Sequence, residues 1–355
     1  MNALILLGGL GSRLRPLTLS RPKPLLPILN RPLISYQIDL LKKFGVKKVV
    51  LALGHKASHF RRHLGNGKSW GVHFIYSFEK EPLGTGGAIR HALPHLKGSA
   101  IVLNGDVLSD FNLGRMAALH RRENADATLA LVEVVDPSAF GLVETTKTGR
   151  IQRFLEKPSG DSFPIRTVNA GCYLFEPRVV ERIPAGKNVS IEREIFPALL
   201  SEGFRVESFL HRGYWSDIGT LKTYWRTHQE MHEQKQWPSG FRRRGGLLFF
   251  PGAHVDGSVR VFGTAVVGAG TRIDRSVTLE GKNTIGENVR IAEGSHIQDT
   301  VILDGARIGP RTRVERSIVG VEASVGADCR VGPDQVLADG AQLPAFSQIV
   351  SSLSE

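Results

Sequence analysis

Basic residues follow a glycine-rich turn close to the start of the chain. An apolar run at residues 3–7 leads into the turn at residues 8–11, and Arg13, Arg15 and Lys23 come after it. Glycine lets a backbone approach phosphate oxygens closely, and successive N–H groups can bind an anion. Arginine adds a planar fork of donors, and lysine adds a mobile charge. This combination predicts a strand followed by a binding site for a triphosphate.

The turn differs from the two best-known phosphate-binding motifs. A Walker loop ends in Gly-Lys-Ser/Thr, whereas this chain has Ser12-Arg13 at that point. A dinucleotide-binding fingerprint would need a third glycine where Leu14 stands, and an acidic residue near positions 31–35. The alternative is a turn that only lets a helix pack on a strand. The basic residues beside a buried strand make this alternative the less favoured one.

Two aspartates stand in settings that suit a metal ion. Asp106 ends Asn104-Gly105-Asp106, directly after an apolar run at residues 100–103, and Asp217 lies in a segment of aromatic residues and glycine at 214–219. Two carboxylates can share one Mg²⁺, which prefers oxygen ligands and completes its octahedron with water and phosphate. The alternatives are that Asp106 caps a turn and Asp217 begins a helix. The sequence leaves open whether the two residues meet.

Other polar or glycine breaks stand beside apolar runs. Lys157 sits between Glu156 and a proline that holds its backbone extended, although a solvated charge pair is the alternative. Gly141 and Asn169 are breaks that turn chemistry alone would also explain. Gly84 lies in a second glycine loop at residues 81–88, which opens a helix and whose N–H groups are suited to a base or an anion.

Length and composition limit the possible classes of protein. The 355 residues suggest two domains. The net charge of +12 favours anionic partners, but no basic motif with interleaved aromatic residues predicts nucleic acid binding. No apolar run is long enough to cross a membrane, and the first one is too short for a signal peptide. Cys172 and Cys329 are far apart, which predicts reduced thiols in a cytoplasmic protein.

The first part of the chain, residues 1–227, alternates strand-like and helix-like segments. Apolar runs predict strands, and amphipathic stretches at residues 33–44, 86–96 and 113–122 predict helices. The expected strands are residues 3–7, 48–53, 72–76, 100–103, 127–134, 151–155 and 170–175. Such alternation predicts an α/β fold with a largely parallel sheet, whose ligands bind beyond the carboxyl ends of the strands.

After a polar and basic linker at residues 228–250 the pattern changes. Aliphatic residues recur every six positions over residues 251–355, with two slips of one residue, before Ile302 and before Val319. This period predicts a parallel β-helix that points one aliphatic residue inward from each face. The positions are Val255, Val261, Val267, Ile273, Leu279, Ile285, Ile291, Ile297, Ile302, Ile308, Val314, Val319, Val325, Val331, Leu337 and Leu343. The repeats resemble the left-handed hexapeptide β-helix family.

Taken together, these motifs resemble the sugar-1-phosphate nucleotidyltransferases, and in particular their GDP-mannose pyrophosphorylase-like branch. The resemblance covers the turn through Lys23-Pro24 and the motifs at residues 81–88, 104–106, 156–158, 169–171, 190–197 and 215–219, with a similar hexapeptide tail. It implies a Rossmann-like domain with a mixed, mostly parallel sheet, followed by a left-handed β-helix. Gly86 departs from the alanine that the branch usually has.

The resemblance also implies a reaction and a set of residues that perform it. The reaction is a Mg²⁺-dependent transfer of a nucleotidyl group from a nucleoside triphosphate, with GTP favoured, to a sugar 1-phosphate. Arg13, Lys23, Asp106, Lys157 and Asp217 would be catalytic, and Asp106 and Asp217 would bind the metal. The nucleotide would contact Leu7, Gly8, Gly9, Gly11, Ser12, Arg13 and Gly84, and the sugar phosphate would contact Gly141, Glu156, Lys157 and Asn169.

Several alternatives stay open at the level of sequence. Glucose 1-phosphate with dTTP or UTP is the nearest substrate alternative, and a non-catalytic regulatory homologue is another. An acyltransferase in the β-helix would need a catalytic histidine, and His254 and His296 stand in no such pattern. An assembly and regulatory role is therefore favoured for the β-helix, and homo-oligomers are expected.

Overall fold

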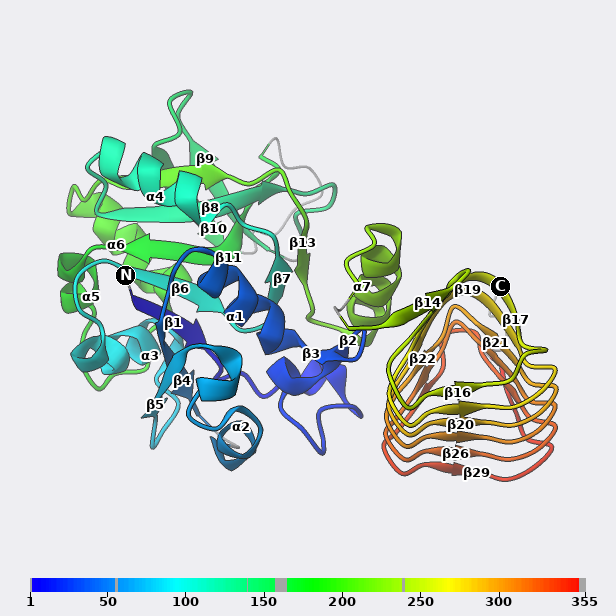
Figure 1. Cartoon of the computed structure of the whole chain (residues 1–355). Coiled ribbons are helices and arrows are strands. Elements are labelled where there is room, and N and C mark those ends of the chain that lie inside the picture. Colours follow the sequence, from blue (N-terminus) through cyan, green and yellow to red (C-terminus); the bar gives the residue numbers. More distant parts are fainter. Residues whose placement is uncertain (1, 55–56, 139, 157–164, 238–239, 351–355) are drawn as a thin grey trace. The chain divides into compact units, whose positions relative to one another are not determined.

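The computed structural model describes residues 2–54, 57–138, 140–156, 165–237 and 240–350, and the chain divides into two compact units (Figure 1). The first unit consists of Met1–Leu10 and Ile34–Asp217, and the second of Gly11–Leu33 and Ile218–Glu355. The chain thus passes from the first unit to the second within the glycine-rich turn and returns at residue 34. The domain boundaries expected at residues 227 and 250 stay a prediction.

Four parallel strands form one half of the sheet in the first unit. β1 (Asn2–Leu6) lies between β4 (Lys48–Leu53) and β6 (Ala100–Asn104), and β5 (His73–Phe78) pairs with β4. Leu4 of β1 pairs with Val50 on one side and with Val102 on the other. These strands are nearly continuous apolar runs because both faces of a parallel sheet are covered.

The other half of the sheet is mainly antiparallel and is centred on β11 (Thr167–Phe175). This strand pairs antiparallel with β6, β8 (Ala127–Glu133) and β9 (Gly141–Thr145). β10 (Ile151–Glu156) pairs antiparallel with β9, and β12 (Val206–Leu210) pairs parallel with β8. The mixed α/β fold expected from the sequence is confirmed.

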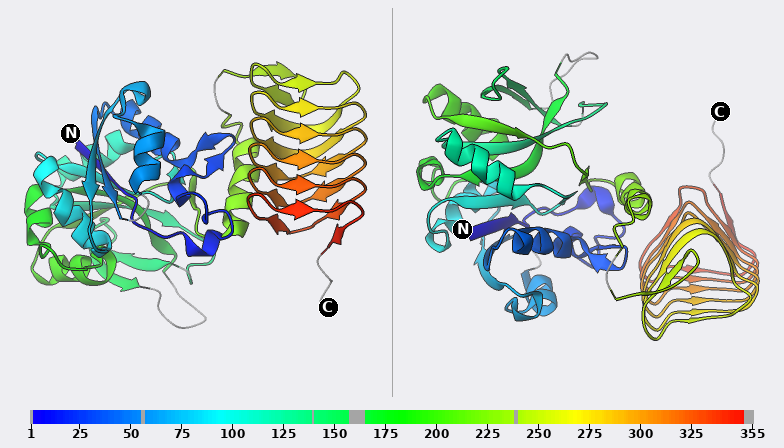
Figure 2. Two further views of the ribbon diagram at one scale, coloured as in Figure 1. Left: turned by 90° about the horizontal axis from the view of Figure 1, so that it is seen from below. Right: turned by 45° about the horizontal axis from the view of Figure 1, so that its top comes forward.

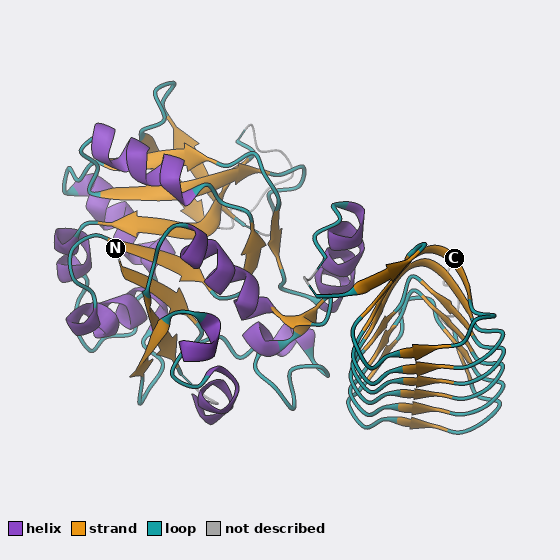
Figure 3. Cartoon of the chain, in the orientation of Figure 1, coloured by secondary structure: helices purple, strands orange, loops and turns teal. Residues whose placement is uncertain are grey.

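Helices pack against this sheet (Figure 3). They are α1 (Leu33–Lys43), α2 (Ala57–Leu64), α3 (Gly84–Ala92), α4 (Leu113–Arg122), α5 (Pro177–Arg182) and α6 (Phe196–Ser201). Short 3₁₀ segments span Lys68–Trp70 and Leu93–His95, and a π-helical turn at Ile191–Ile195 leads into α6. α4 begins at the residue after Asn112, whose side chain accepts a hydrogen bond from the Arg115 N–H.

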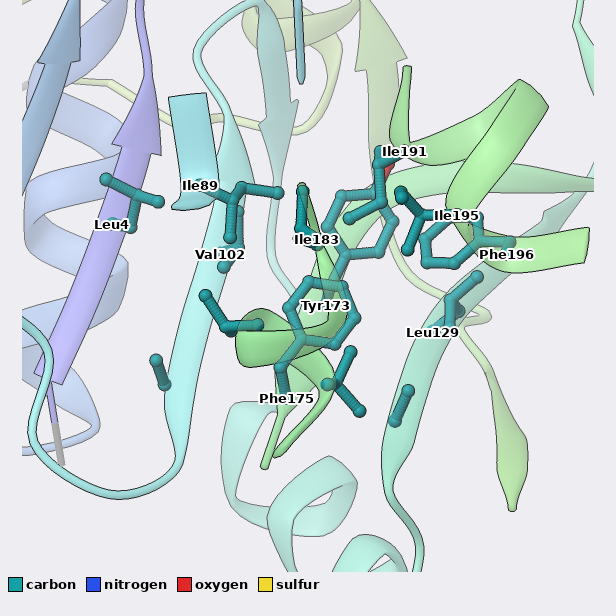
Figure 4. Packing of buried hydrophobic residues seen from close by; sticks show 14 of the residues in the cluster. Leu4, Ile89, Val102, Leu129, Tyr173, Phe175, Ile183, Ile191, Ile195 and Phe196 are labelled. Carbon is teal, nitrogen blue, oxygen red and sulfur yellow. The ribbon is translucent and has the colours of Figure 1, made fainter. Parts of the chain in front are cut away.

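Aromatic rings from the sheet and from α6 form the centre of the core in the first unit. The Tyr173 and Phe175 rings of β11 stack with centroids 5.5 Å apart, and the Phe196 ring meets Tyr173 edge-on at 5.4 Å (Figure 4). Leu4 and Val102 belong to the same buried cluster. This packing fixes β1 and β6, whose carboxyl ends carry the candidate site.

The repeats of the second unit form a β-helix, seen along its axis in Figure 1 and from the side in Figure 2. Successive coils pair in parallel, and all sixteen expected aliphatic positions belong to one apolar core. Arg272 pairs with Arg290, 18 residues later, whereas Arg290 pairs with Arg307 after a step of 17 residues. The next pairing, from Arg307 to Ser324, is also a 17-residue step, so the two slips in the repeat are two shorter coils.

The coils have three faces. One face contains β16 (His254–Val255), β18 (Arg272–Ile273), β20 (Arg290–Ile291), β23 (Arg307–Ile308), β26 (Ser324–Val325) and β29 (Gln342–Leu343). The other two are built from β14 (Arg242–Arg244), β15 (Leu247–Phe249), β17 (Arg260–Val267), β19 (Thr278–Ile285), β21 (His296–Gln298), β22 (Val301–Ile302), β24 (Arg313–Glu315), β25 (Ile318–Val319), β27 (Arg330–Val331), β28 (Val336–Leu337) and β30 (Gln348–Ile349).

A helix and a hairpin complete the second unit. α7 (Leu221–Glu233) begins with a capping box formed by Thr220 and Thr223, and it contacts β19. The hairpin pairs β2 (Pro27–Ile28) with β3 (Arg31–Pro32), and its two turn residues, Leu29 and Asn30, both have positive φ. In the described part of the chain, no helix is both long and apolar enough to span a bilayer.

The aliphatic stack should carry the stability of the β-helix. Ile291 is fully buried in the core, whereas the preceding residue, Arg290, faces solvent. We expect Ile291→Ala to lower the free energy of unfolding by about 2–5 kcal/mol, through lost apolar burial and the cavity left behind. Arg290→Ala, the matched control, should change it by less than about 0.5 kcal/mol. Equal effects in urea unfolding would contradict the assignment of the inward face.

Candidate functional site

The glycine turn and the Asn-Gly-Asp motif leave the first unit's sheet at the same edge. The Gly105 N–H donates to the Leu6 carbonyl at 2.9 Å, and the Leu7 N–H donates to the Ala52 carbonyl at 2.9 Å. β1 is followed by residues 7–9, and β6 is followed by Gly105-Asp106. Since β1 has parallel neighbours on both sides, this is the edge at which α/β sheets bind ligands.

Neither the backbone conformation nor packing within the protein requires glycine at positions 8 and 9. Both are exposed, and neither has the positive φ that favours glycine. A Cβ built on either would meet no atom of the described residues within 4 Å. The open space above this backbone fits the close approach of a ligand.

Gly105 contrasts with them, because it is required by close packing. A Cβ built there would lie 2.4 Å from the Leu6 carbonyl oxygen and 2.6 Å from Leu7 Cδ2. The absence of a side chain therefore allows the turn after β6 to lie against the end of β1. This contact carries the half-buried Asp106 to the edge of the sheet.

The second aspartate reaches the same place through a two-stranded ladder. β7 (Val107–Ser109) pairs antiparallel with β13 (Trp215–Asp217), and Asp217 stands opposite Val107, the residue after Asp106. The two carboxylate-bearing residues are therefore neighbours in the backbone register. Carboxylates supply hard oxygen ligands of the kind that a divalent cation such as Mg²⁺ prefers.

Within the described ranges, no group of three or more His, Cys, Asp and Glu side chains could hold a metal ion. A pair of aspartates suits Mg²⁺ bound to a nucleotide, because such an ion keeps several waters and takes further oxygens from substrate phosphates. The donor set formed by Asp106 and Asp217 thus fits the group that the sequence predicts.

The Asn-Ala-Gly motif forms an irregularity in β11 beside these aspartates. A Cβ on Gly171 would lie 2.9 Å from Asn104 Nδ2, and Trp215 Nε1 donates to the Ala170 carbonyl at 2.9 Å. Asn169 Nδ2 donates to the Tyr173 hydroxyl at 2.9 Å, and Asn169 Oδ1 accepts from the Gly171 N–H at 3.1 Å. This motif therefore packs against Asn104 and Trp215. Both the nitrogen and the oxygen of the Asn169 side-chain amide are hydrogen-bonded within the protein.

Gly141 and Glu156 lie opposite each other at the ends of β9 and β10. The Phe140 ring, next to Gly141, meets the Trp215 ring edge-on, with centroids 5.5 Å apart. This contact places the start of β9 beside the strand that carries Asp217. Lys157, the residue after β10, lies outside the described residues.

Gly84 begins α3 with a φ of 68°, and its loop is packed against residues 187–192. The Val189 carbonyl accepts from the Gly86 N–H at 2.8 Å and from the Gly87 N–H at 3.4 Å. Thr85 Oγ1 donates to Glu192 Oε2 at 2.8 Å. The sequence suggests that the N–H groups of this loop bind a base or an anion. Those of Gly86 and Gly87 instead donate to a carbonyl of the protein itself.

The basic residues that follow the glycine-rich turn belong to the second unit. Gly11 has a φ of 62°, and a Cβ on it would lie 3.2 Å from Lys23 Cβ and 3.1 Å from Thr18 Cγ2. Thr18 Oγ1 donates to the Gly11 carbonyl at 2.7 Å, which closes the loop. Arg13 lies exposed with Ser12 in a 3₁₀ turn (Ser12–Leu14). Lys23, in the 3₁₀ turn Lys23–Leu25, is only 9% exposed, which is unusual for a lysine.

Sequence reasoning missed three residues that shape these parts of the protein. Thr18 closes the loop around Lys23, Asn104 packs on Gly171, and Trp215 joins three motifs through its ring and its N–H. Trp215 and Asn104 stood inside motifs singled out for their aspartates. Nothing about Thr18 in the sequence distinguishes it from an ordinary turn residue.

Comparison with known proteins agrees with this geometry. Residues 2–234 match the family described as Nucleotidyl transferase, and residues 252–350 match the GMPPB C-terminal domain. The chain is 39% identical over 301 residues to mannose-1-phosphate guanylyltransferase of Mycobacterium tuberculosis, covering 84% of this chain and 83% of that protein. It is 35% identical over 363 residues to the catalytic subunit beta of the same enzyme in Drosophila pseudoobscura, covering 100% of this chain and 95% of that protein.

Among solved structures, HddC from Yersinia pseudotuberculosis complexed with GMP-PN is similar in fold. The TM-score is 0.56 and the identity 26%, over 65% of this chain and 99% of that one. The two family matches, the relatives along nearly the whole chain and the arrangement of motifs at the sheet edge lead to one conclusion: the chain belongs to the nucleotidyl transferase family.

Proposed function

We propose that the protein is a mannose-1-phosphate guanylyltransferase, which converts GTP and mannose 1-phosphate to GDP-mannose and pyrophosphate. The observation that carries the proposal is the pairing of β7 with β13, in which Asp217 stands opposite Val107, the residue after Asp106. The names of the relatives favour GTP and mannose 1-phosphate as the substrates.

The reaction needs no general base. A phosphate monoester has a second pKa of about 6, so a sugar 1-phosphate is mostly a dianion at neutral pH. One of its oxygens attacks the α-phosphorus of the triphosphate, the new P–O bond forms, and the bond to the β-phosphate breaks with release of pyrophosphate. Holding the two substrates in line can supply roughly 7–11 kcal/mol of the barrier.

The protein's residues would bind, orient and neutralise the reacting groups. Members of the family generally use a divalent metal, and Asp106 and Asp217 would hold Mg²⁺, which supplies positive charge to the phosphates. Arg13 would bind the triphosphate and the departing pyrophosphate, and Lys23 would lie near the α-phosphate and the sugar phosphate. The backbone at Leu7, Gly8, Gly9, Gly11 and Ser12 would line the nucleotide, with Gly84 near the base. Gly141, Glu156, Lys157 and Asn169 would contact the sugar phosphate.

Two alternatives from the sequence are less favoured. A thymidylyl- or uridylyltransferase acting on glucose 1-phosphate would share this fold, but the relatives at 39% and 35% identity are guanylyltransferases. A regulatory homologue without activity would be expected to lack one of the aspartates proposed to bind the metal, whereas Asp106 and Asp217 are both present and lie close in the register of β7 and β13. The expected homo-oligomer and the cytoplasmic location stay predictions.

A substrate grid tests the proposed function. Four nucleoside triphosphates are each paired with mannose 1-phosphate and glucose 1-phosphate in the presence of Mg²⁺, and pyrophosphate release is followed. We expect GTP with mannose 1-phosphate to have the highest kcat/KM, and chelation of the metal to stop the reaction. A preference for dTTP with glucose 1-phosphate would exclude the guanylyltransferase, and no release from any pair would favour the regulatory alternative.

The aspartate pair makes a second prediction. Asp217→Asn and Asp106→Asn should each lower kcat by at least about 100-fold, because each removes one charged ligand and weakens stabilisation of the transferring phosphate. Both variants should also need more Mg²⁺ for half-maximal activity. Asp39→Asn, at a half-exposed carboxylate of α1, is the matched control and should retain activity. Parent-like activity in either site variant would remove the metal assignment.

A third prediction concerns Gly9 and Gly105, at the carboxyl edge of the sheet. Gly9→Ala should raise the KM for GTP at least about fivefold by blocking close approach of the nucleotide, with unfolding free energy changed by less than about 0.5 kcal/mol. Gly105→Ala should instead destabilise the fold by about 1–3 kcal/mol, because its methyl group would meet the Leu6 carbonyl. Unchanged KM values in Gly9→Ala would argue against nucleotide binding at this turn.

A further inference from the structure

A chain of buried polar side chains joins the β-helix to the hairpin of the second unit. Thr264 Oγ1 lies 3.0 Å from His232 Nδ1, and His232 Nε2 lies 3.2 Å from Thr284 Oγ1. Thr284 Oγ1 lies 3.0 Å from His228 Nδ1, and His228 Nε2 lies 3.1 Å from the Pro27 carbonyl oxygen. His228, His232 and Thr284 are each at most 3% exposed.

The direction of each hydrogen bond in this series of side chains follows from its final acceptor, the Pro27 carbonyl. A carbonyl only accepts, so His228 Nε2 must donate to Pro27 and its Nδ1 must accept from the Thr284 hydroxyl. Thr284 then accepts from His232 Nε2, which leaves His232 Nδ1 to accept from the Thr264 hydroxyl. Both nitrogens of each imidazole are thereby hydrogen-bonded, as buried polar groups require.

Both imidazoles are held neutral, as this order of donors requires. Burial lowers the pKa of His228 to about 3, with the neighbouring His232 adding to the shift. Burial and the Lys282 ammonium lower the pKa of His232 to about 4, partly offset by the Asn283 carbonyl. At neutral pH each ring therefore carries one N–H, whose position is set by its neighbours.

The Pro27 carbonyl has a second donor on α7. The Tyr224 hydroxyl donates to the same oxygen at 2.6 Å, and its ring meets the His228 ring edge-on with centroids 4.9 Å apart. In the hairpin the Leu33 N–H donates to the Leu26 carbonyl at 2.9 Å. Since residues of an antiparallel pair alternate in hydrogen bonding, the next carbonyl, that of Pro27, turns away from its partner strand and is available to α7.

The hairpin and the loop before it have two further attachments to the β-helix. Asn30 Nδ2, at the hairpin tip, donates to the Ile285 carbonyl at 2.7 Å. Ser20 Oγ donates to Asp339 Oδ2, and Arg21 Nη2 lies 3.9 Å from the same oxygen. The segment that contains Lys23 is therefore attached on both sides of that residue.

The geometry points to α7 and the β-helix as a scaffold that positions Lys23, with His228 and Tyr224 as its positioning residues. This inference rests on the role proposed for Lys23 above. The Leu26 N–H donates to the Lys23 carbonyl at 3.0 Å, so the lysine and Pro27 belong to one short hydrogen-bonded segment. A shift of the Pro27 carbonyl would move the backbone that carries the ammonium group.

A polar chain suits positioning better than simple attachment. Apolar contacts would fasten α7 to the β-helix and the hairpin without the desolvation of His228, His232 and Thr284. Hydrogen bonds are directional, so they fix the orientation of the Pro27 peptide group as well as its distance. In phosphoryl transfer such precision matters, since displacement by about 1 Å can cost about 100-fold in rate.

Two substitutions at position 228 separate positioning from packing. In His228→Gln the side-chain amide can occupy the place of Nε2 and still donate to Pro27, whereas in His228→Asn the amide reaches only the place of Nδ1. We expect His228→Asn to lower kcat for GTP and mannose 1-phosphate by about 10- to 100-fold. The KM for mannose 1-phosphate should change less than kcat, and His228→Gln should restore most of the activity. Tyr224→Phe, which removes the second donor, should give a smaller loss.

Trp225→Phe is the matched control. It removes the hydrogen bond from Trp225 Nε1 to the Asp299 carbonyl, which also fastens α7 to the β-helix but lies outside the chain to Pro27. We expect parent-like kcat in this variant. A loss equal to that of His228→Asn, or equal activity of the Asn and Gln variants at position 228, would show that α7 acts only by packing and would overturn the inference.

Amide hydrogen exchange tests the same inference without any substrate. The amides of Leu25, Leu26 and Leu33 are hydrogen-bonded within the Lys23 segment, and they should exchange at least about fivefold faster in His228→Asn than in His228→Gln. Equal exchange would overturn the inference even if the parent enzyme is active. If the parent releases no pyrophosphate from any substrate pair, the proposed function fails, and faster exchange in His228→Asn still supports the ordering of this segment by His228.

Discussion

The position of β1 between two parallel neighbours is the constraint on which the candidate metal site depends. With β4 on one side and β6 on the other, the chain leaves β1 at an edge where neighbouring connections run in opposite directions. The turn after β6 must then lie against the end of β1, and only glycine at position 105 leaves room for the Leu6 carbonyl. Asp106 reaches the edge as a consequence, and the β7–β13 ladder adds Asp217.

In the second unit, apolar packing stabilises the β-helix, whereas polar contacts orient the segment at residues 11–33. Stacked aliphatic residues hold the β-helix together, and because each coil repeats the same contact, one coil can lose a residue without loss of the core. The loop and hairpin at residues 11–33 also make single, directional polar contacts, to Asp339, to the Ile285 carbonyl and, from Pro27, to His228, which bonds to Thr284. Apolar stacking tolerates small shifts, whereas these hydrogen bonds select one geometry.

Much of the fold could be predicted from local patterns. The strand at Lys48–Leu53 and the helix at Leu113–Arg122 have the predicted bounds, and the strand expected at residues 170–175 extends three residues further, because the Asn-Ala-Gly irregularity lies inside β11. α7 was not predicted. Its sequence is polar, and the residues that it buries include His228, Gln229 and His232, which apolar periodicity does not detect. Tertiary partners, rather than apolar side chains, make that face a buried one.

The sequence by itself determined the types of element, the six-residue period of the β-helix with its two short coils, and the motifs that identify the family. These are local properties, since the periods of 2, 3.6 and 6 residues are set by backbone geometry over short stretches. Only the tertiary structure decided that Asp217 stands beside Asp106, that Trp215 joins three motifs, and that His228 and Tyr224 share the Pro27 carbonyl. Each of these pairs residues far apart in the chain, and such pairings depend on how the whole core packs rather than on the residues alone.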